Sequence, residues 1–242
     1  MNYEYGIQMY SLHDLAKKDL AAALKAVGEM GYSYVEFAGF FDHTADEVCK
    51  MLEDAKIGVK SAHGSLKELK PDVIDETIAF HKAIGNKSFV IPMAKLNTLA
   101  NIDEFVGIVN QAQEKLAANG ISLGYHNHSD ELVTKYWGTT ILTELERRTS
   151  IDFQIDVFWA FNAGVDPVIL CERMKDRIKY IHLMDGMLGG RGVALGEGHV
   201  SLDKIIAMAK ANNMGMIVES EGFYPSGVEE VARCMEFLKA NG

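Results

Sequence analysis

Short apolar runs alternate with longer amphipathic runs along the whole of this chain. The short runs are rich in β-branched and aromatic residues and predict strands, whereas the longer runs repeat their apolar positions about every 3.6 residues and predict helices. The predicted strands are Tyr5–Ser11, Tyr32–Ala38, Gly58–His63, Lys87–Met93, Ile121–His126, Asp152–Val157, Ile178–Leu183 and Met216–Glu219. The predicted helices cover residues 17–30, 44–56, 71–84, 101–119, 137–148, 167–176, 201–212 and 227–240.

Residues typical of helix ends support these boundaries. Thr44, with Glu47 three residues later, forms a capping-box pattern at the start of the second predicted helix. Asp166 precedes Pro167, which suits an N-cap followed by proline in the first helical turn. Gly31 follows the first predicted helix, where a left-handed residue is favoured.

Eight successive strand–helix units joined by short loops indicate a sheet of parallel strands. A doubly wound open sheet shares this alternation, but the count of eight units and the length of 242 residues favour closure. The sequence therefore predicts an α/β protein, one (β/α)8 TIM barrel that forms a single domain over residues 1–242.

The composition is that of a folded protein with an acidic surface. Hydrophobic residues make up 48% of the chain, enough for a large core. The 24 Lys and Arg residues against 34 Asp and Glu residues give a net charge of −10, which disfavours nucleic acid as a partner because its backbone is negative. No run reaches the ~18 apolar residues of a membrane span, and the N-terminus lacks a signal-peptide pattern. The three widely spaced cysteines form no disulfide framework, so we expect a cytoplasmic protein with no membrane partner.

Polar side chains gather at the ends of the predicted strands, where a closed parallel barrel carries its functional groups. They are Glu36, His63, His126, His128, Asp156, His182 and Glu219. Because side chains alternate along a strand, those on the last four strands can all point into the barrel while their apolar neighbours face the helices. His81, by contrast, lies in a helical stretch and is expected to be solvated.

Imidazoles and carboxylates at one barrel mouth form a mixed nitrogen and oxygen ligand set. Such a set suits Mn²⁺, Zn²⁺, Co²⁺ or Fe²⁺ better than Ca²⁺, which prefers oxygen ligands. A single histidine at a strand end is more often a structural residue than a ligand. Ligand-type residues on four consecutive strands nevertheless favour a site for one divalent metal ion.

Seven motifs carry a family resemblance, in this order along the chain: GIQMYSL (6–12), GYSYVEFAG (31–39), GYHNHSDEL (124–132), IDVFWAFNAGVDP (155–167), IHLMDG (181–186), GEGHVSLDKI (196–205) and IVESEG (217–222). Together they resemble the xylose-isomerase-like TIM-barrel superfamily. That superfamily includes sugar phosphate isomerases and epimerases, inosose dehydratases and type-IV apurinic endonucleases. The resemblance extends over essentially the whole chain.

The resemblance implies a metal site built at the ends of strands five to eight. Asp156, His182 and Glu219 match the later ligands of the family, and His126 stands where the first ligand is usually a glutamate. His128, two residues on, is the alternative ligand. An imidazole at this position leaves the site with one negative charge fewer, which shifts the expected metal preference from Mg²⁺ towards Mn²⁺, Zn²⁺ or Co²⁺.

The resemblance further implies an isomerase or epimerase of a small sugar-like keto substrate, working through an enediolate. Of the paired acid/base glutamates in the family's 3-epimerases, only Glu219 is retained, and it is the expected proton carrier. His63 and Glu36 are expected as further catalytic residues, with a rim hydrogen bond or ion pair as their alternative role. The residues expected to bind substrate are His128, Trp159, Glu221 and Arg191.

Three other functions stay open at this stage. A lyase of the inosose dehydratase type would use the same metal and enolate chemistry but would release water. A metal phosphodiesterase of the apurinic endonuclease type disagrees with the net charge of −10. A non-catalytic sugar- or metal-binding module would need no open coordination position. The expected partner is a small carbohydrate, and the sequence leaves a homo-oligomer open.

Overall fold

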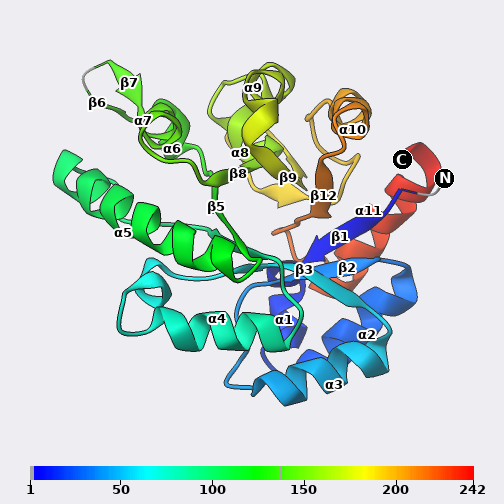
Figure 1. Ribbon diagram of the computed structural model, residues 1–242. Coiled ribbons are helices and arrows are strands. Elements are labelled where there is room, and N and C mark those ends of the chain that lie inside the picture. The colour runs from blue at the N-terminus through cyan, green and yellow to red at the C-terminus, as the bar shows by residue number, and fades with distance from the viewer. Residues whose placement is uncertain (1–2, 137) are drawn as a thin grey trace.

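The computed structural model describes residues 3–136 and 138–242, and its main sheet is a closed barrel of eight parallel strands (Figure 1). The strands are β1 (Tyr5–Gln8), β2 (Tyr34–Phe37), β3 (Gly58–His63), β4 (Ser88–Ile91), β5 (Ser122–His126), β8 (Asp152–Asp156), β9 (Ile178–Leu183) and β12 (Gly215–Val218). β1 pairs in parallel with both β2 and β12, which closes the ring. The predicted TIM barrel is confirmed.

A helix follows each barrel strand, and these helices surround the barrel (Figure 1). They are α2 (Leu20–Met30), α3 (Ala45–Ala55), α4 (Ile74–Ala83), α5 (Leu99–Ala118), α7 (Ile141–Arg148), α9 (Pro167–Met174), α10 (Leu202–Ala211) and α11 (Gly227–Asn241). All eight predicted helices are present. The helix predicted over 137–148 begins at a residue outside the described part of the chain, and α7 starts later because Thr140 caps it through a hydrogen bond from Thr143 N.

The helix ends follow the local signals in the sequence. Thr44 and Glu47 form the capping box of α3, and the Asp166 side chain accepts from two backbone N–H groups at the start of α9. Gly31 ends α2 with a φ of 100°, a left-handed conformation that favours glycine. Among the described residues, none of these helices combines the length and the apolar character needed to cross a membrane.

Two expectations about local structure were wrong. The first strand ends at Gln8 instead of Ser11, because the Gln8 side chain accepts from Tyr10 N and turns the chain into a 3-10 helix over Met9–Leu12. His81 is buried against aromatic side chains, and it is not solvated. The structure also adds short elements that the sequence pattern did not predict. They are α1 (His13–Ala16), α6 (Asp130–Val133), α8 (Val157–Asn162) and two antiparallel strand pairs, β6 (Lys135–Tyr136) with β7 (Thr139–Thr140) and β10 (Asp185–Gly186) with β11 (Gly192–Val193).

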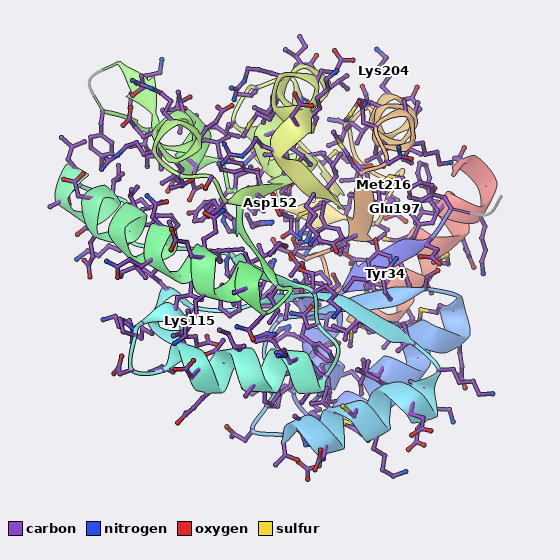
Figure 2. All side chains as sticks on the ribbon, viewed as in Figure 1. Tyr34, Lys115, Asp152, Glu197, Lys204 and Met216 are labelled. Atoms are coloured by element: carbon purple, nitrogen blue, oxygen red, sulfur yellow. The ribbon has the colours of Figure 1, made fainter. Side chains whose placement is uncertain are left out.

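The barrel interior and the outer core are separate apolar layers. Tyr34, Tyr180 and Ile217 form a cluster of their own, whereas Ile155 and Ile181, which alternate with inward residues, belong to the large core that also contains the helix residues. Tyr34 OH donates to Met216 O at 2.9 Å, and Figure 2 shows both residues among the central strands. This inner layer closes the barrel beneath the polar residues of the mouth.

Candidate active site

One buried carboxylate gathers polar side chains inside the barrel. Glu36 on β2 accepts hydrogen bonds from Gln8 Nε2 at 2.8 Å and from Gln154 Nε2 at 2.7 Å. His182 Nε2 lies 2.6 Å from Glu36 Oε1, and His63 Nε2 lies 3.0 Å from the same oxygen. We call Gln8, Glu36, His63 and Gln154 the floor of the site. Its members come from β1, β2, β3 and β8, so strands far apart in the sequence meet at one carboxylate.

The negative charge of the buried Glu36 carboxylate is compensated by the side chains around it. Burial alone would raise the pKa of Glu36, but the charges and hydrogen bonds of His63 and His182 hold that pKa well below its ordinary value. The strand register shifts between Val35 and Glu36, and it shifts again at Gln154. Irregularities of this kind re-aim side chains next to functional sites. Glu36 is therefore an ionised, positioned group.

Four potential metal ligands lie next to the floor. His126, Asp156, His182 and Glu219 each offer one ligand atom, and these atoms all lie within 4.8 Å of one another. We call these four residues the ligand cluster. They come from β5, β8, β9 and the residue that follows β12, and their side chains are buried. His182 Nδ1 lies 2.7 Å from Glu219 Oε2. His63, His126 and His182 form a second group that meets the same distance limit.

Asp156 provides the test of whether this cluster suits a metal ion. Its Oδ1 accepts the backbone N–H of Trp159 at 2.7 Å, whereas its Oδ2 is buried and has no hydrogen-bond partner among the described residues. Burial, followed by the negative charge of Glu219, raises the pKa of Asp156 well above its ordinary value. A buried carboxylate oxygen without a donor, beside a second carboxylate, is the environment that a divalent cation compensates. The donor set and its charge therefore fit a metal ion.

Hydrogen bonds to the floor orient both histidines of the ligand cluster. The Nε2 group of Gln154 donates to Glu36, which leaves Gln154 Oε1 facing His126 Nδ1 at 3.1 Å. Because an amide oxygen only accepts, His126 Nδ1 carries the ring proton. His126 Nε2 is then left with the lone pair. Burial would lower the pKa of His182, but Glu219 and Glu36 raise it to about 10. A bound cation would take the place of the His182 Nδ1 proton, while Nε2 keeps its bond to Glu36.

The site opens on a cavity of about 510 Å³ at the carboxyl ends of the strands. Five of the predicted site residues line it: His63, His126, His128, Glu219 and Glu221. The rest of the wall comes from the segments after β1 to β4, and it includes Tyr10, Gly39, Pro92 and Met93. The volume is in the range of sites for small molecules, roughly 300–1,000 Å³.

Two further groups at the cavity wall have altered acidity. The backbone N–H of His128 donates to Glu131 Oε2 at 2.9 Å, and its ring packs against Trp159 with ring centroids 5.5 Å apart. Burial lowers the pKa of His128. Burial, and then the negative charge of Glu219, raises the pKa of Glu221 to about 7. Glu221 is therefore a cavity-lining carboxyl group that can gain or lose a proton near neutral pH.

Other predicted site residues lie away from the cavity wall. Glu36 lies beneath it in the floor, and Trp159 contacts it through His128. Arg191 is exposed between β10 (Asp185–Gly186) and β11 (Gly192–Val193), outside the lining. Sequence reasoning missed the floor roles of Gln8 and Gln154. The available signal was a single glutamine at an inward position of an otherwise apolar strand segment.

The family comparison agrees with this architecture. A family model described as a xylose isomerase-like TIM barrel matches residues 21–241. A sugar phosphate isomerase/epimerase from Parabacteroides distasonis ATCC 8503 superimposes with a TM-score of 0.82 and 28% sequence identity, over 97% of this chain and 96% of that one.

More distant structures show the same fold. The probable 3-DHS dehydratase AsbF from Bacillus anthracis has a TM-score of 0.76 at 14% identity, over 98% of this chain and 99% of that one. D-allulose 3-epimerase from Methylomonas sp., solved with D-allulose, has a TM-score of 0.74 at 15% identity, over 100% of this chain and 98% of that one. No protein of curated function matches the chain in sequence.

Proposed function

This chain belongs to the xylose isomerase-like TIM-barrel family, and from that premise we propose that it is a metal-dependent isomerase or epimerase of a small keto sugar or sugar-like substrate. The observation that carries the proposal is the ligand cluster with the unpaired Asp156 Oδ2, placed beside a cavity that His126 and Glu219 also line. The similarity to a sugar phosphate isomerase/epimerase at 28% identity supports carbohydrate chemistry.

A divalent ion held by His126, Asp156, His182 and Glu219 would polarise a substrate carbonyl and stabilise the negative charge that develops on its oxygen. Mn²⁺, Zn²⁺ and Co²⁺ suit the two imidazoles and two carboxylates of this set. With two neutral imidazoles and two carboxylates, the protein ligands carry a charge that one such ion balances.

Glu221 and Glu219 are the groups proposed to move the proton. Glu221 lines the cavity without belonging to the ligand cluster, so its carboxylate can accept a proton from a carbon next to the carbonyl and return it. Glu219 shares this role as a ligand that reaches the cavity. His63, which lines the cavity from the floor, can move a proton between substrate oxygens.

Substrate binding is assigned to the remaining polar wall. His128 offers an imidazole to a substrate hydroxyl, and Trp159 supports that imidazole from behind. The proposed role of Glu36 is to position His182 and His63, since its carboxylate is already engaged by four side chains. A role for Arg191 in substrate binding stays a prediction.

A lyase is the second candidate, because one observation disfavours the two-base mechanism of an epimerase. On the β5 side the cavity is lined by the imidazoles of His126 and His128, so no carboxylate there can pair with Glu219 in two-base proton transfer. One-base isomerisation and dehydration are both compatible with this asymmetry. Isomerisation keeps the composition of the substrate, whereas dehydration removes one water.

The test is to incubate the Mn²⁺-loaded protein in D₂O with free ketoses, and to follow products by NMR and mass spectrometry. We expect deuterium incorporation next to the carbonyl, which a chelator abolishes and Glu221→Gln strongly slows. A product lighter by one water identifies the lyase. If a metal-loaded protein incorporates no deuterium from any keto compound, the proposed function is wrong.

A further inference from the structure

We infer that the cavity takes an uncharged polyhydroxy ketone and excludes sugar phosphates, an inference that rests on the proposed function and narrows its substrate class. The charge of the cavity wall is the first argument. Three carboxylates line it, Glu68, Glu219 and Glu221, and no lysine or arginine of the described chain does so. The Lys and Arg residues of the connections that follow the barrel strands are exposed and lie outside the lining: Lys17, Lys18, Lys67, Lys70, Lys95, Lys135 and Arg191.

Backbone N–H groups in the loops that commonly bind phosphate are already bonded to side chains of this protein. TIM barrels that bind phosphate commonly do so with backbone N–H groups of the loops after the seventh and eighth strands, together with a helix N-terminus. Here these strands are β9 and β12, and in each loop a buried carboxylate of the protein already accepts from two or more backbone N–H groups.

Asp185 fills the loop between β9 and α10. Its Oδ1 accepts from Gly186 N at 2.8 Å and from Val200 N at 3.0 Å, and its Oδ2 accepts from Gly196 N and Gly198 N, both at 3.0 Å. The side chain is buried, and a side chain at Gly198 would collide with it. Four backbone N–H groups of this loop therefore already donate to the side chain of Asp185.

Glu230, on the first turns of α11, fills the loop after β12. Its carboxylate accepts from Gly222 N at 2.9 Å, from Tyr224 N at 2.7 Å and from the hydroxyl of Ser220. The N-terminus of α11 is capped as well, since Glu229 N donates to Ser226 Oγ at 3.2 Å. Two N–H groups of this loop and one N–H group in the first turn of α11 are therefore already engaged within the protein.

The wall after β3 repeats the pattern inside the cavity itself. Ser65 and Glu68 form a capping box in which Glu68 Oε1 accepts from Ser65 N at 2.7 Å and from Ser65 Oγ at 2.9 Å. Both donors of Ser65 are thus occupied by a carboxylate that would also repel a phosphate. Neutral hydroxyl groups meet no such repulsion, and they can donate to the same carboxylates.

The test compares matched substrates on the Mn²⁺-loaded protein. The probes are D-fructose, D-tagatose and D-allulose, the 6-phosphate of each, and inorganic phosphate. We expect deuterium exchange with at least one free ketose, kcat/KM at least about 100-fold lower for its 6-phosphate because of like-charge repulsion, and no competition by inorganic phosphate. Equal or faster exchange with the phosphate ester overturns the inference while leaving the proposed proton transfer intact.

A pair of charge variants shows whether the wall sets this preference. Met93 lines the cavity and is 68% exposed, so Met93→Lys adds a cation at its rim. We expect the ratio of kcat/KM for the free ketose to kcat/KM for its 6-phosphate to fall about tenfold. Ile169→Lys adds the same charge on α9, at a position that is 66% exposed and outside the lining, and should leave the ratio unchanged.

Calorimetric binding separates failure of the inference from failure of the proposed function. If no probe exchanges deuterium but a free ketose binds and its phosphate does not, the proposed reaction fails and the inference holds. If inorganic phosphate or the esters bind more tightly than the free ketoses, and Met93→Lys leaves the ratio unchanged, the inference is wrong.

Discussion

Glu36 and Asp156 are both fully buried in the barrel mouth, yet their surroundings shift the pKa of the two carboxyl groups in opposite directions. Glu36 lies in the floor among four hydrogen-bonding partners, and His63 and His182 hold its pKa well below the ordinary value. Asp156 lies in the ligand cluster with one free oxygen, and burial with the negative charge of Glu219 raises its pKa. The floor is electrostatically complete in the protein alone, whereas the ligand cluster needs a cation.

This difference separates two tasks within one site. The floor orients the two histidines of the ligand cluster, because Gln154 faces His126 Nδ1 and Glu36 faces His182 Nε2. The ligand cluster holds the charge deficit that makes metal binding favourable. Substitutions in the two regions should therefore change metal affinity in the same direction but change the stability of the metal-free fold in opposite directions.

The largest effect is expected for Asp156→Asn. Metal affinity should fall by at least about 100-fold, because a ligand charge is lost, and catalytic activity should fall with it. The melting temperature of the metal-free protein should stay the same or rise, since a carboxylate with a raised pKa is replaced by a neutral amide. Elemental analysis after dialysis and thermal unfolding with a chelator measure the two quantities.

Asp152→Asn is the matched control for that substitution. Asp152 begins the same strand, at the other end of β8 from Asp156, and Figure 2 shows its position beside β5. It should leave metal content unchanged. A metal-free Asp156→Asn protein that is clearly less stable than the parent would show that Asp156 is compensated without a metal.

A smaller loss of affinity is expected for Glu36→Gln, which tests the floor. Metal affinity should fall by about 10- to 100-fold, as for other carboxylates that orient a ligand histidine. The free energy of unfolding of the metal-free protein should fall by about 3 kcal/mol, because His63 and His182 lose their buried counter-charge. Metal titration and urea unfolding measure both. Full metal affinity and stability with lost activity would instead place Glu36 in contact with substrate.

The two glutamines of the floor offer a finer test. Gln154→Leu removes the acceptor that faces His126 Nδ1, so metal affinity should fall by about tenfold. Gln8→Leu removes a different donor to Glu36 and leaves the contact to His126 in place, so its metal affinity should match the parent. Equal losses in both variants would mean that the floor acts only through the charge of Glu36.

The fold was predictable because each of its signals is local or periodic. Alternation along a strand was enough to place the apolar neighbours of the mouth residues towards the helices, and Ile155 and Ile181 do lie in the outer core. The end of β1 was mispredicted because Gln8 bonds Tyr10 N, a side-chain contact that outweighs the apolar pattern of the next residues.

The site was predictable only as a list of residues at strand ends. Which of them would contact one another depends on register between strands distant in the sequence, and that register is irregular at Glu36 and Gln154. Sequence reasoning therefore identified Glu36 as a group at the mouth but had no means of showing that four side chains already surround it. His81 was mispredicted because its burial on α4 depends on packing against Phe40 and Phe89, which belong to other segments of the chain.

His81 isolates the effect of burial from the effect of charge. Its Nδ1 accepts from Asn86 Nδ2 at 2.9 Å, a neutral partner, and burial lowers its pKa to about 4, the opposite of His182. The unfolded chain, with a pKa near 6.5, therefore takes up a proton before the folded protein does. The contribution of neutral His81 to the free energy of unfolding is fully present above a pH of about 6.5. It is lost as the pH falls towards 4, by roughly 1 kcal/mol per pH unit. In the metal-free protein, His81→Gln should flatten this slope in urea unfolding measured across that range. Parallel slopes for the parent and the variant would show that the acid sensitivity comes from the mouth and that burial alone does not set it.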